Sequence, residues 1–242
     1  MRRRHFLAAA CSCVLCAGAA RPSDLIEPHM HFVPSGAAPE VCMTLDACMG
    51  ATDHRILDTL IGNAIPATIF ATRRWLDHNP DVVKTLLAHK DLFAVENHGA
   101  MHIPAIIGTE TAYGIAPAGT ADAVFAEVEG GQQAVTAALG IAPRWYRDAT
   151  ALYTQDAINL IGTMSLRIAG FSLNGDLGAS VPAAIAQKRI AAARSGDVII
   201  SHINQPTRSS GQGVADGLLE LKASGFRFLH LDDVTMRSGL LV

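Results

Sequence analysis

The chain has 242 residues and a net charge of −3, and half of its residues are apolar. This length can bury the core of one α/β barrel or of two small domains. Charged residues make up only 17% of the chain, which argues against disorder, and no basic tract is interleaved with aromatic residues, which argues against a nucleic-acid partner.

The first twenty residues have the pattern of an export signal peptide. Arginines at positions 2–4 precede a short apolar run at 6–16, and small residues at 17–19 form a cleavage site. The run is too short to span a bilayer, so we expect no integral membrane span after removal of the signal. Arg3-Arg4-His5-Phe6-Leu7 resembles the twin-arginine signal, with an ordinary secretory peptide as the alternative. Both interpretations predict a periplasmic or secreted protein whose single domain covers residues 21–242.

Two of the five cysteines, Cys42 and Cys48, lie outside this leader. Cys42 falls within a predicted strand and Cys48 just beyond its end. Six residues of near-extended chain would separate them by up to roughly 20 Å, which is beyond the reach of a disulfide. We therefore expect two free thiols, both mostly buried. Cys48 follows Asp46 closely enough to lie near a site, and burial is the alternative that we prefer for it.

Strands and helices alternate from residue 41 onward, after a proline-rich segment at 21–40. Seven apolar runs are predicted as strands: 41–45, 66–71, 92–95, 144–146, 166–173, 197–200 and 226–231. Helices are predicted from a Thr52 cap to Gly62-Asn63, within 75–89, and at 121–139, 154–161, 182–193 and 214–223. This alternation predicts a parallel sheet with βαβ crossovers. The loop at 99–119 is long, which is typical of a functional or mobile segment.

Five polar residues able to do chemistry stand at the ends of predicted strands: Asp46, His98, His102, Arg147 and His202. In a barrel of parallel strands these ends meet on one face, where active sites are built. The spacing His98-x-x-x-His102 at a strand end indicates one side of a metal site, for which zinc, cobalt or nickel are suitable ions. A solvated histidine pair is the alternative.

Asp46 ends an apolar run, where a carboxylate is costly to bury without a partner. A metal or Arg147 would lower its pKa and keep it ionised. The alternative is an aspartate that caps the next turn. For His202 the alternative is a hydrogen-bonded histidine of the core.

These residues lie in segments that resemble motifs of the polysaccharide deacetylase family, the NodB-homology carbohydrate esterases. The resemblance runs from about residue 41 onward, and five motifs occur in the family's order. The matching segments are Thr44-Leu45-Asp46-Ala47, Asn97-His98-Gly99-Ala100-Met101-His102, Tyr146-Arg147-Asp148-Ala149-Thr150, Phe171-Ser172-Leu173-Asn174-Gly175-Asp176 and Ile200-Ser201-His202, and Ile65-Pro66-Ala67-Thr68-Ile69-Phe70 resembles the family's second strand.

The resemblance implies a distorted (β/α)7 barrel of parallel strands with outer helices, matching the seven strands counted above. It implies a hydrolase that acts on non-peptide carbon–nitrogen bonds and removes acetyl groups from an N- or O-acetylated cell-envelope or extracellular polysaccharide. By the same resemblance, His98 and His102 would hold a divalent metal, with zinc preferred and cobalt or nickel as alternatives. Asp46 would be the general base, Arg147 would orient it, and His202 would be the general acid.

The chain departs from the family pattern at several positions. Ala47 stands where a second aspartate usually binds the metal, so Asp46, Asp53 or water would replace it. The fourth motif has no tryptophan, and either Asn174 or Asp176 would serve for its aspartate. Ala149 stands where a proline is usual. Two alternative functions follow: cleavage of a non-peptide C–N bond in a small molecule, and an inactive glycan-binding relative.

Overall fold

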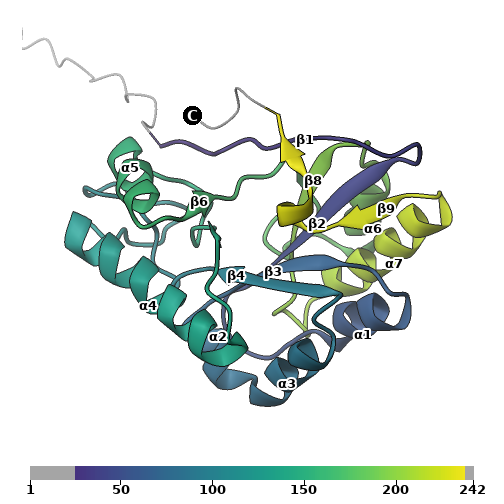
Figure 1. Ribbon diagram of the computed structural model, residues 1–242, viewed down its shortest axis with the longest axis horizontal. Coiled ribbons are helices and arrows are strands. Elements are labelled where there is room, and N and C mark those ends of the chain that lie inside the picture. Colours follow the sequence, from purple (N-terminus) through teal and green to yellow (C-terminus); the bar gives the residue numbers. More distant parts are fainter. Residues whose placement is uncertain (1–24, 238–242) are drawn as a thin grey trace, which may run out of the picture.

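The computed structural model describes residues 25–237, so the predicted signal peptide lies outside the described residues. Its centre is a sheet in which every pairing is parallel, with the order β6-β5-β4-β3-β2-β8-β7 and with β9 also paired to β2. Figure 1 labels β2, β3, β4, β6, β8 and β9 of this sheet. The strands are β2 (Glu40–Ala47), β3 (Ala67–Ala71), β4 (Phe93–Asn97), β5 (Trp145–Tyr146), β6 (Arg167–Ile168), β7 (Leu173–Asn174), β8 (Asp197–His202) and β9 (Arg227–Leu229).

The two edge strands of this sheet, β6 and β7, are consecutive in the chain and are joined by residues 169–172 alone. That connection spans at most about 18 Å. Seven strands spaced about 4.8 Å apart would make a flat sheet about 29 Å wide. The sheet must therefore curl until its edges approach each other, as in a barrel. β2 also changes neighbour along its length, since Glu40–Cys42 pairs with β9 and Thr44–Ala47 with β3, which distorts the barrel.

The central strand β2 is buried along its whole length, as expected for a parallel strand covered on both faces. Its alternate residues face different cores. Val41, Met43, Leu45 and Ala47 pack in the core between sheet and helices, whereas Cys42 packs with Phe32, Phe70, Trp145 and Val198 in a second, inner core. Asp46 lies an even number of residues from Cys42, so the strand directs its side chain to the same inner side.

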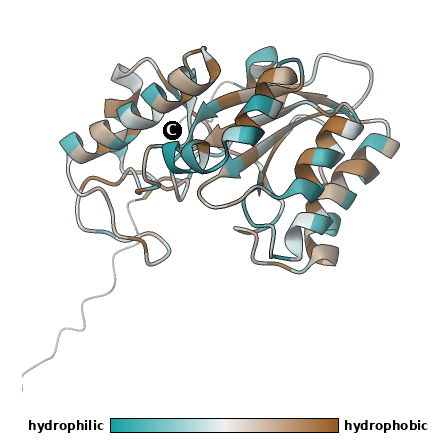
Figure 2. Ribbon diagram, turned by 90° about the horizontal axis from the view of Figure 1, so that it is seen from below, coloured by the Kyte–Doolittle hydropathy of each residue, from teal (hydrophilic) through white to brown (hydrophobic). Residues whose placement is uncertain are grey.

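Seven helices of the described chain lie around the sheet (Figure 2). They are α1 (His54–Gly62), α2 (Arg73–His78), α3 (Pro80–Ala88), α4 (Ala121–Leu139), α5 (Gln155–Thr163), α6 (Ala183–Ala191) and α7 (Ser210–Ala223). Their buried apolar residues pack in two hydrophobic clusters, of which the smaller includes Ala157 and Ile161 of α5. A 3-10 turn (Leu231–Asp233) is followed by β10 (Thr235–Met236), which pairs antiparallel with β1 (Phe32–Val33) from the start of the described chain. Within residues 25–237 no helix is long and apolar enough to cross a membrane.

The structure corrects three predicted elements. The run at 166–173 is two strands, β6 and β7, at opposite edges of the sheet, because residues 169–172 between them leave the sheet and bend at Ser172. Gly170 in this segment lies so close to Pro28 that a Cβ would come 2.1 Å from the Pro28 carbonyl oxygen. The segment 75–89 holds two helices, because Pro80 starts a new helix after Asn79. The cap of α1 is Asp53 rather than Thr52, and its carboxylate accepts a hydrogen bond from the Arg55 backbone N–H.

Candidate active site and metal centre

The predicted site residues lie at or just beyond the carboxyl ends of neighbouring strands. Asp46 and His202 are directly paired across β2 and β8, and His98 and Arg147 follow the last residues of β4 and β5. Asp46, His102 and His202 line a cavity of about 550 Å³, together with Cys48. The sheet therefore brings Asp46, His102 and His202 to one cavity. His98 lies beside Cys48, and Arg147 lies behind Asp46.

A wholly buried arginine fixes the position of Asp46. Arg147 donates from Nη1 to Asp46 Oδ1 at 2.9 Å and to Thr44 Oγ1 at 2.8 Å, and from Nη2 to the Gly170 carbonyl oxygen at 2.9 Å. Its guanidinium also lies 4.3 Å from the centre of the Phe70 ring. Burial raises the pKa of Asp46, but the charge of Arg147 opposes this and the net pKa lies below its ordinary value. Asp46 is therefore held as an ionised carboxylate.

The backbone fixes the tautomer and direction of His98. His98 Nδ1 lies 2.8 Å from the Arg147 carbonyl oxygen, which can only accept, so Nδ1 carries the hydrogen. In the neutral imidazole Nε2 then holds a free lone pair, the arrangement found in metal-binding histidines. That Nε2 faces Cys48 Sγ at 3.5 Å and lies 4.0 Å from Asp46 Oδ2.

His102 is held in an unusual backbone conformation. Its φ is +66°, a left-handed value that non-glycine residues adopt mainly where neighbouring structure imposes it. The imposing group is Glu127 of α4, a buried carboxylate that accepts the backbone N–H groups of Met101, His102 and Ile103. His102 Nε2 is buried without a hydrogen-bond partner, which is uncommon for a polar atom and suits a metal ligand.

His202 has an aspartate partner, Asp176. His202 Nδ1 lies 3.0 Å from Asp176 Oδ1, and its backbone N–H donates to Oδ2 at 2.7 Å. Burial lowers the pKa of His202, but the Asp176 charge and hydrogen bond raise it well above its ordinary value. Asn174, the other candidate for this role, instead accepts a hydrogen bond from the Leu177 backbone N–H.

Cys48 lies inside the site. Both cysteines of the described chain are free and buried, as predicted. However, the ligand atoms of Cys48, His98 and His102 all lie within 4.8 Å of one another, a donor set of one sulfur and two nitrogens that suits zinc or cobalt. The signal for this was available, because Cys48 follows Asp46 by two residues and the strand period places both on the same side.

Two acidic residues have roles that the sequence interpretation did not anticipate. Asp53, considered as a substitute for the missing metal ligand, is turned toward α1, where its buried carboxylate forms an ion pair with the partly exposed Arg55. It therefore does not join the site. Glu127, which positions the loop of His102, was not recognised because it lies within a long amphipathic helix and no strand precedes it.

Comparisons with known proteins identify the family and the fold. Residues 35–169, more than half of the chain, match the family model of polysaccharide deacetylases. No curated protein sequence gives a significant match. Among solved structures, a peptidoglycan deacetylase from Bacillus subtilis, PdaC, is 18% identical with a TM-score of 0.66, over 83% of this chain and 91% of that one. A second Bacillus subtilis protein, PdaA, a family 4 carbohydrate esterase, is 17% identical with a TM-score of 0.67, over 85% and 83%.

A third structure is a pseudoenzyme of carbohydrate esterase family 4 from Bacillus anthracis. It is 16% identical with a TM-score of 0.65, over 83% of this chain and 66% of that one. At such identities the structural likenesses establish the fold, and they confirm the prediction of a distorted (β/α)7 barrel of parallel strands. The family model extends this to the sequence, and the chain belongs to the polysaccharide deacetylase family.

Proposed function

We propose that this chain is a metal-dependent hydrolase that removes acetyl groups from an N- or O-acetylated polysaccharide of the cell envelope or the extracellular space. The observation that carries the proposal is the pairing of Asp46 with His202 on adjacent strands, each oriented by its own buried partner. Arg147 holds Asp46 ionised, and Asp176 favours protonated His202. Two neighbouring groups with opposed protonation states are what a general base and a general acid require.

The chemistry of the residues follows from these states. Asp46 accepts the proton of the attacking water as the acetyl carbonyl is attacked, and Arg147 fixes the direction of its carboxylate. His202 donates a proton to the departing sugar nitrogen, or to the sugar oxygen of an O-acetyl group. The products are acetate and a free amine or hydroxyl. His98 and His102 would hold the divalent metal, with zinc preferred and cobalt or nickel as alternatives, which when bound polarises the acetyl carbonyl.

The cavity supports a sugar substrate. Two aromatic residues line it, Tyr113 from the loop at 99–119 and Phe171 from the connection between β6 and β7, with apolar contacts from Ile115 and Leu177. Aromatic and apolar faces of this kind contact the rings and acetyl methyls of glycans. The solved relatives include enzymes named as peptidoglycan deacetylases, so peptidoglycan is the first substrate to test. With the predicted leader at 1–20, the proposed location is periplasmic or extracellular.

Acetate release is the direct test. Purified protein is assayed on peptidoglycan, on N-acetylated oligosaccharides and on an O-acetylated xylan, beside the variants Asp46→Asn and His202→Ala. Loss of acid–base catalysis is expected to lower turnover by roughly 10²–10⁴-fold in each variant. His54→Ala is the matched control, because His54 is an exposed histidine of α1 outside the site, and it should retain the wild-type rate.

Three results would contradict the proposal in different ways. A wild-type rate for His202→Ala would remove the general-acid role. Turnover of a small amide without acetate release from any glycan would favour a different C–N hydrolase on this scaffold. A metal-loaded wild-type protein that releases no acetate from any of these substrates would favour an inactive glycan-binding relative.

A further inference from the structure

We propose that the thiolate of Cys48 is the third protein ligand of the metal, so that the site is a Cys-His-His centre. This inference rests on the metal dependence in the proposed function, and it concerns a residue that the sequence interpretation assigned to burial. Ala47, the residue between Asp46 and Cys48, offers no ligand atom, and it packs in the outer core against the helices. Cys48 is therefore the nearest donor in the chain beyond Asp46.

The distances suit a tetrahedral ion. A metal with sulfur at about 2.3 Å and nitrogen at about 2.0–2.1 Å would separate the two ligand atoms by roughly 3.5 Å at a tetrahedral angle. Cys48 Sγ and His98 Nε2 are 3.5 Å apart. All three ligand atoms, including that of His102, are within 4.8 Å of one another, which places the third donor near the other two.

Neighbouring groups orient or bury the three proposed ligands in a way that favours metal binding. The Arg147 carbonyl oxygen fixes His98 with its Nε2 lone pair toward the sulfur. His102 Nε2 is buried with no hydrogen-bond partner, and a shared ion would satisfy it. Cys48 is 7% exposed, so its sulfur is screened from bulk water but still borders the cavity. Asp46 is hydrogen-bonded to Arg147, and with Cys48 as the ligand it can act as the base and need not bind the metal.

One competing arrangement uses the same atoms. His202, oriented by Asp176, also interacts with Cys48, and a thiol beside such a pair resembles a nucleophile with its base. A nucleophile needs one activating imidazole, whereas Cys48 has His98 and His102 beside it as well. The three-atom cluster therefore favours metal binding, and a covalent acetyl–thioester on Cys48 becomes an outcome that the experiment must detect.

Cobalt substitution tests the inference without relying on activity. The protein is stripped of metal, loaded with Co²⁺, and examined for the near-ultraviolet absorption that arises when a thiolate binds cobalt. We expect this band in the wild type and in Cys42→Ala, and its loss in Cys48→Ser together with at least a roughly tenfold weaker Co²⁺ affinity. Cys42 is the matched control, since it is a buried thiol of β2, the strand that ends just before Cys48, and its Sγ lies near the His230 carbonyl oxygen rather than the site.

Cys48→Asp separates ligation from a merely structural role. A carboxylate can replace the thiolate as a ligand, so this variant should bind one equivalent of Co²⁺ while lacking the sulfur band. Retention of the band in Cys48→Ser, or a wild-type protein that binds Co²⁺ without the band, would overturn the inference. A stable acetyl group on Cys48, found by mass spectrometry after incubation with substrate, would also overturn it. Acetate release is measured separately, so wild-type deacetylation without a sulfur band would leave the proposed function standing.

Discussion

Arg147 shows how one side chain can connect several parts of a site. Its guanidinium donates to a carboxylate, a hydroxyl and backbone carbonyl oxygens, and all of these partners are buried. A planar group with five N–H donors is suited to such a divided set of acceptors, whereas an ammonium group is a point charge with a different geometry. The ionised state of Asp46 therefore depends on the planar geometry of the Arg147 guanidinium as well as on its positive charge.

Arg147→Lys is consequently expected to be severe despite the conserved charge. Lysine would leave buried acceptors of Thr44, Ala169 or Gly170 without donors, and we expect a loss of roughly 2–4 kcal/mol in the free energy of unfolding and at least a tenfold loss of turnover. Urea denaturation and acetate release measure the two effects. Arg144→Lys is the control, because Arg144 is mostly exposed and pairs with Asp232 at the surface. Equal stability of the two lysine variants would contradict this account of Arg147.

At the scale of elements, helix α4 positions the loop that carries both histidines. Gly131 of α4 lies against this loop so closely that a Cβ there would come 2.1 Å from Asn97 Oδ1 and 2.6 Å from the Gly99 carbonyl carbon. Gly99 itself has a φ of +87°, and its Cβ would meet the Glu127 carboxylate at 2.4 Å. The helix and the loop therefore fit only because both glycines lack a side chain.

Gly131→Ala should force α4 and the loop apart. We expect a loss of about 1–3 kcal/mol in stability, as for other overpacked sites, and weaker Co²⁺ binding because His98 and His102 move. Gly162→Ala in α5 is a matched control, since nothing lies within 4 Å of a Cβ there and helical Gly→Ala substitutions stabilise by about 0.5–1 kcal/mol. Thermal unfolding and metal titration of both variants check the contrast. An unchanged metal affinity in Gly131→Ala would show that the loop does not depend on α4.

Elements governed by local pattern could be predicted, and those governed by distant contacts could not. The bounds of α4 follow from its 3.6-residue period, and the strand-end rule located Asp46, His98, Arg147 and His202 at one end of the sheet. The interruption at 169–172 was missed because residues 166–173 resemble one strand, and the contacts of Gly170 and Phe171 with Pro28 and Met30 join segments that are far apart in the sequence. The site position of Cys48 was missed because a buried thiol is usually structural.

At the scale of the whole molecule, the closure of the barrel and the site are linked. The connection 169–172 brings the two edges of the sheet together, and Arg147 binds the carbonyl oxygens of Ala169 and Gly170 within it. The same guanidinium holds Asp46 of the central strand. The base of the proposed reaction and the segment that joins the two sheet edges are thus held by the same side chain.

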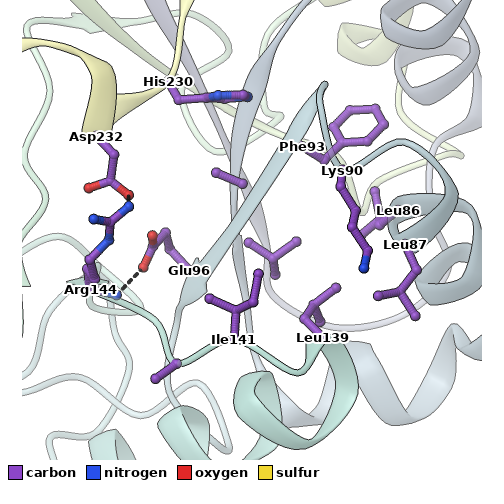
Figure 3. Close-up of a pocket in the computed structure, with 13 residues that line it drawn as sticks. Leu86, Leu87, Lys90, Phe93, Glu96, Leu139, Ile141, Arg144, His230 and Asp232 are labelled. Atoms are coloured by element: carbon purple, nitrogen blue, oxygen red, sulfur yellow. Dashed lines mark hydrogen bonds and ion pairs between the residues drawn. The ribbon is translucent and has the colours of Figure 1, made fainter.

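A second cavity lies at the start of β5, away from the carboxyl ends that carry the site (Figure 3). It is lined on one side by apolar residues of α3 and α4 and on the other by Glu96, Arg144, His230 and Asp232. Glu96 is 4% exposed and accepts backbone N–H groups of Arg144 and Trp145 at 2.7 and 2.8 Å. Burial raises the pKa of Glu96 from 4.5 to about 7, and although these two hydrogen bonds oppose the rise, the Asp232 charge adds to it.

This carboxyl should make the stability of the whole fold depend on pH. Between about pH 4.5 and 7 the folded chain retains a proton on Glu96 that the unfolded chain has lost, so stability falls as pH rises through this window. The full effect is on the order of 3 kcal/mol. Glu96→Gln has no carboxyl to ionise, so its stability relative to the wild type should rise from pH 4.5 to 8, as measured by urea denaturation across that range. Glu110→Gln is the control, because Glu110 is exposed on the loop at 99–119, and its stability should follow that of the wild type across the pH range. If the stabilities of Glu96→Gln and the wild type change with pH in parallel, the buried carboxyl does not control the stability of the barrel.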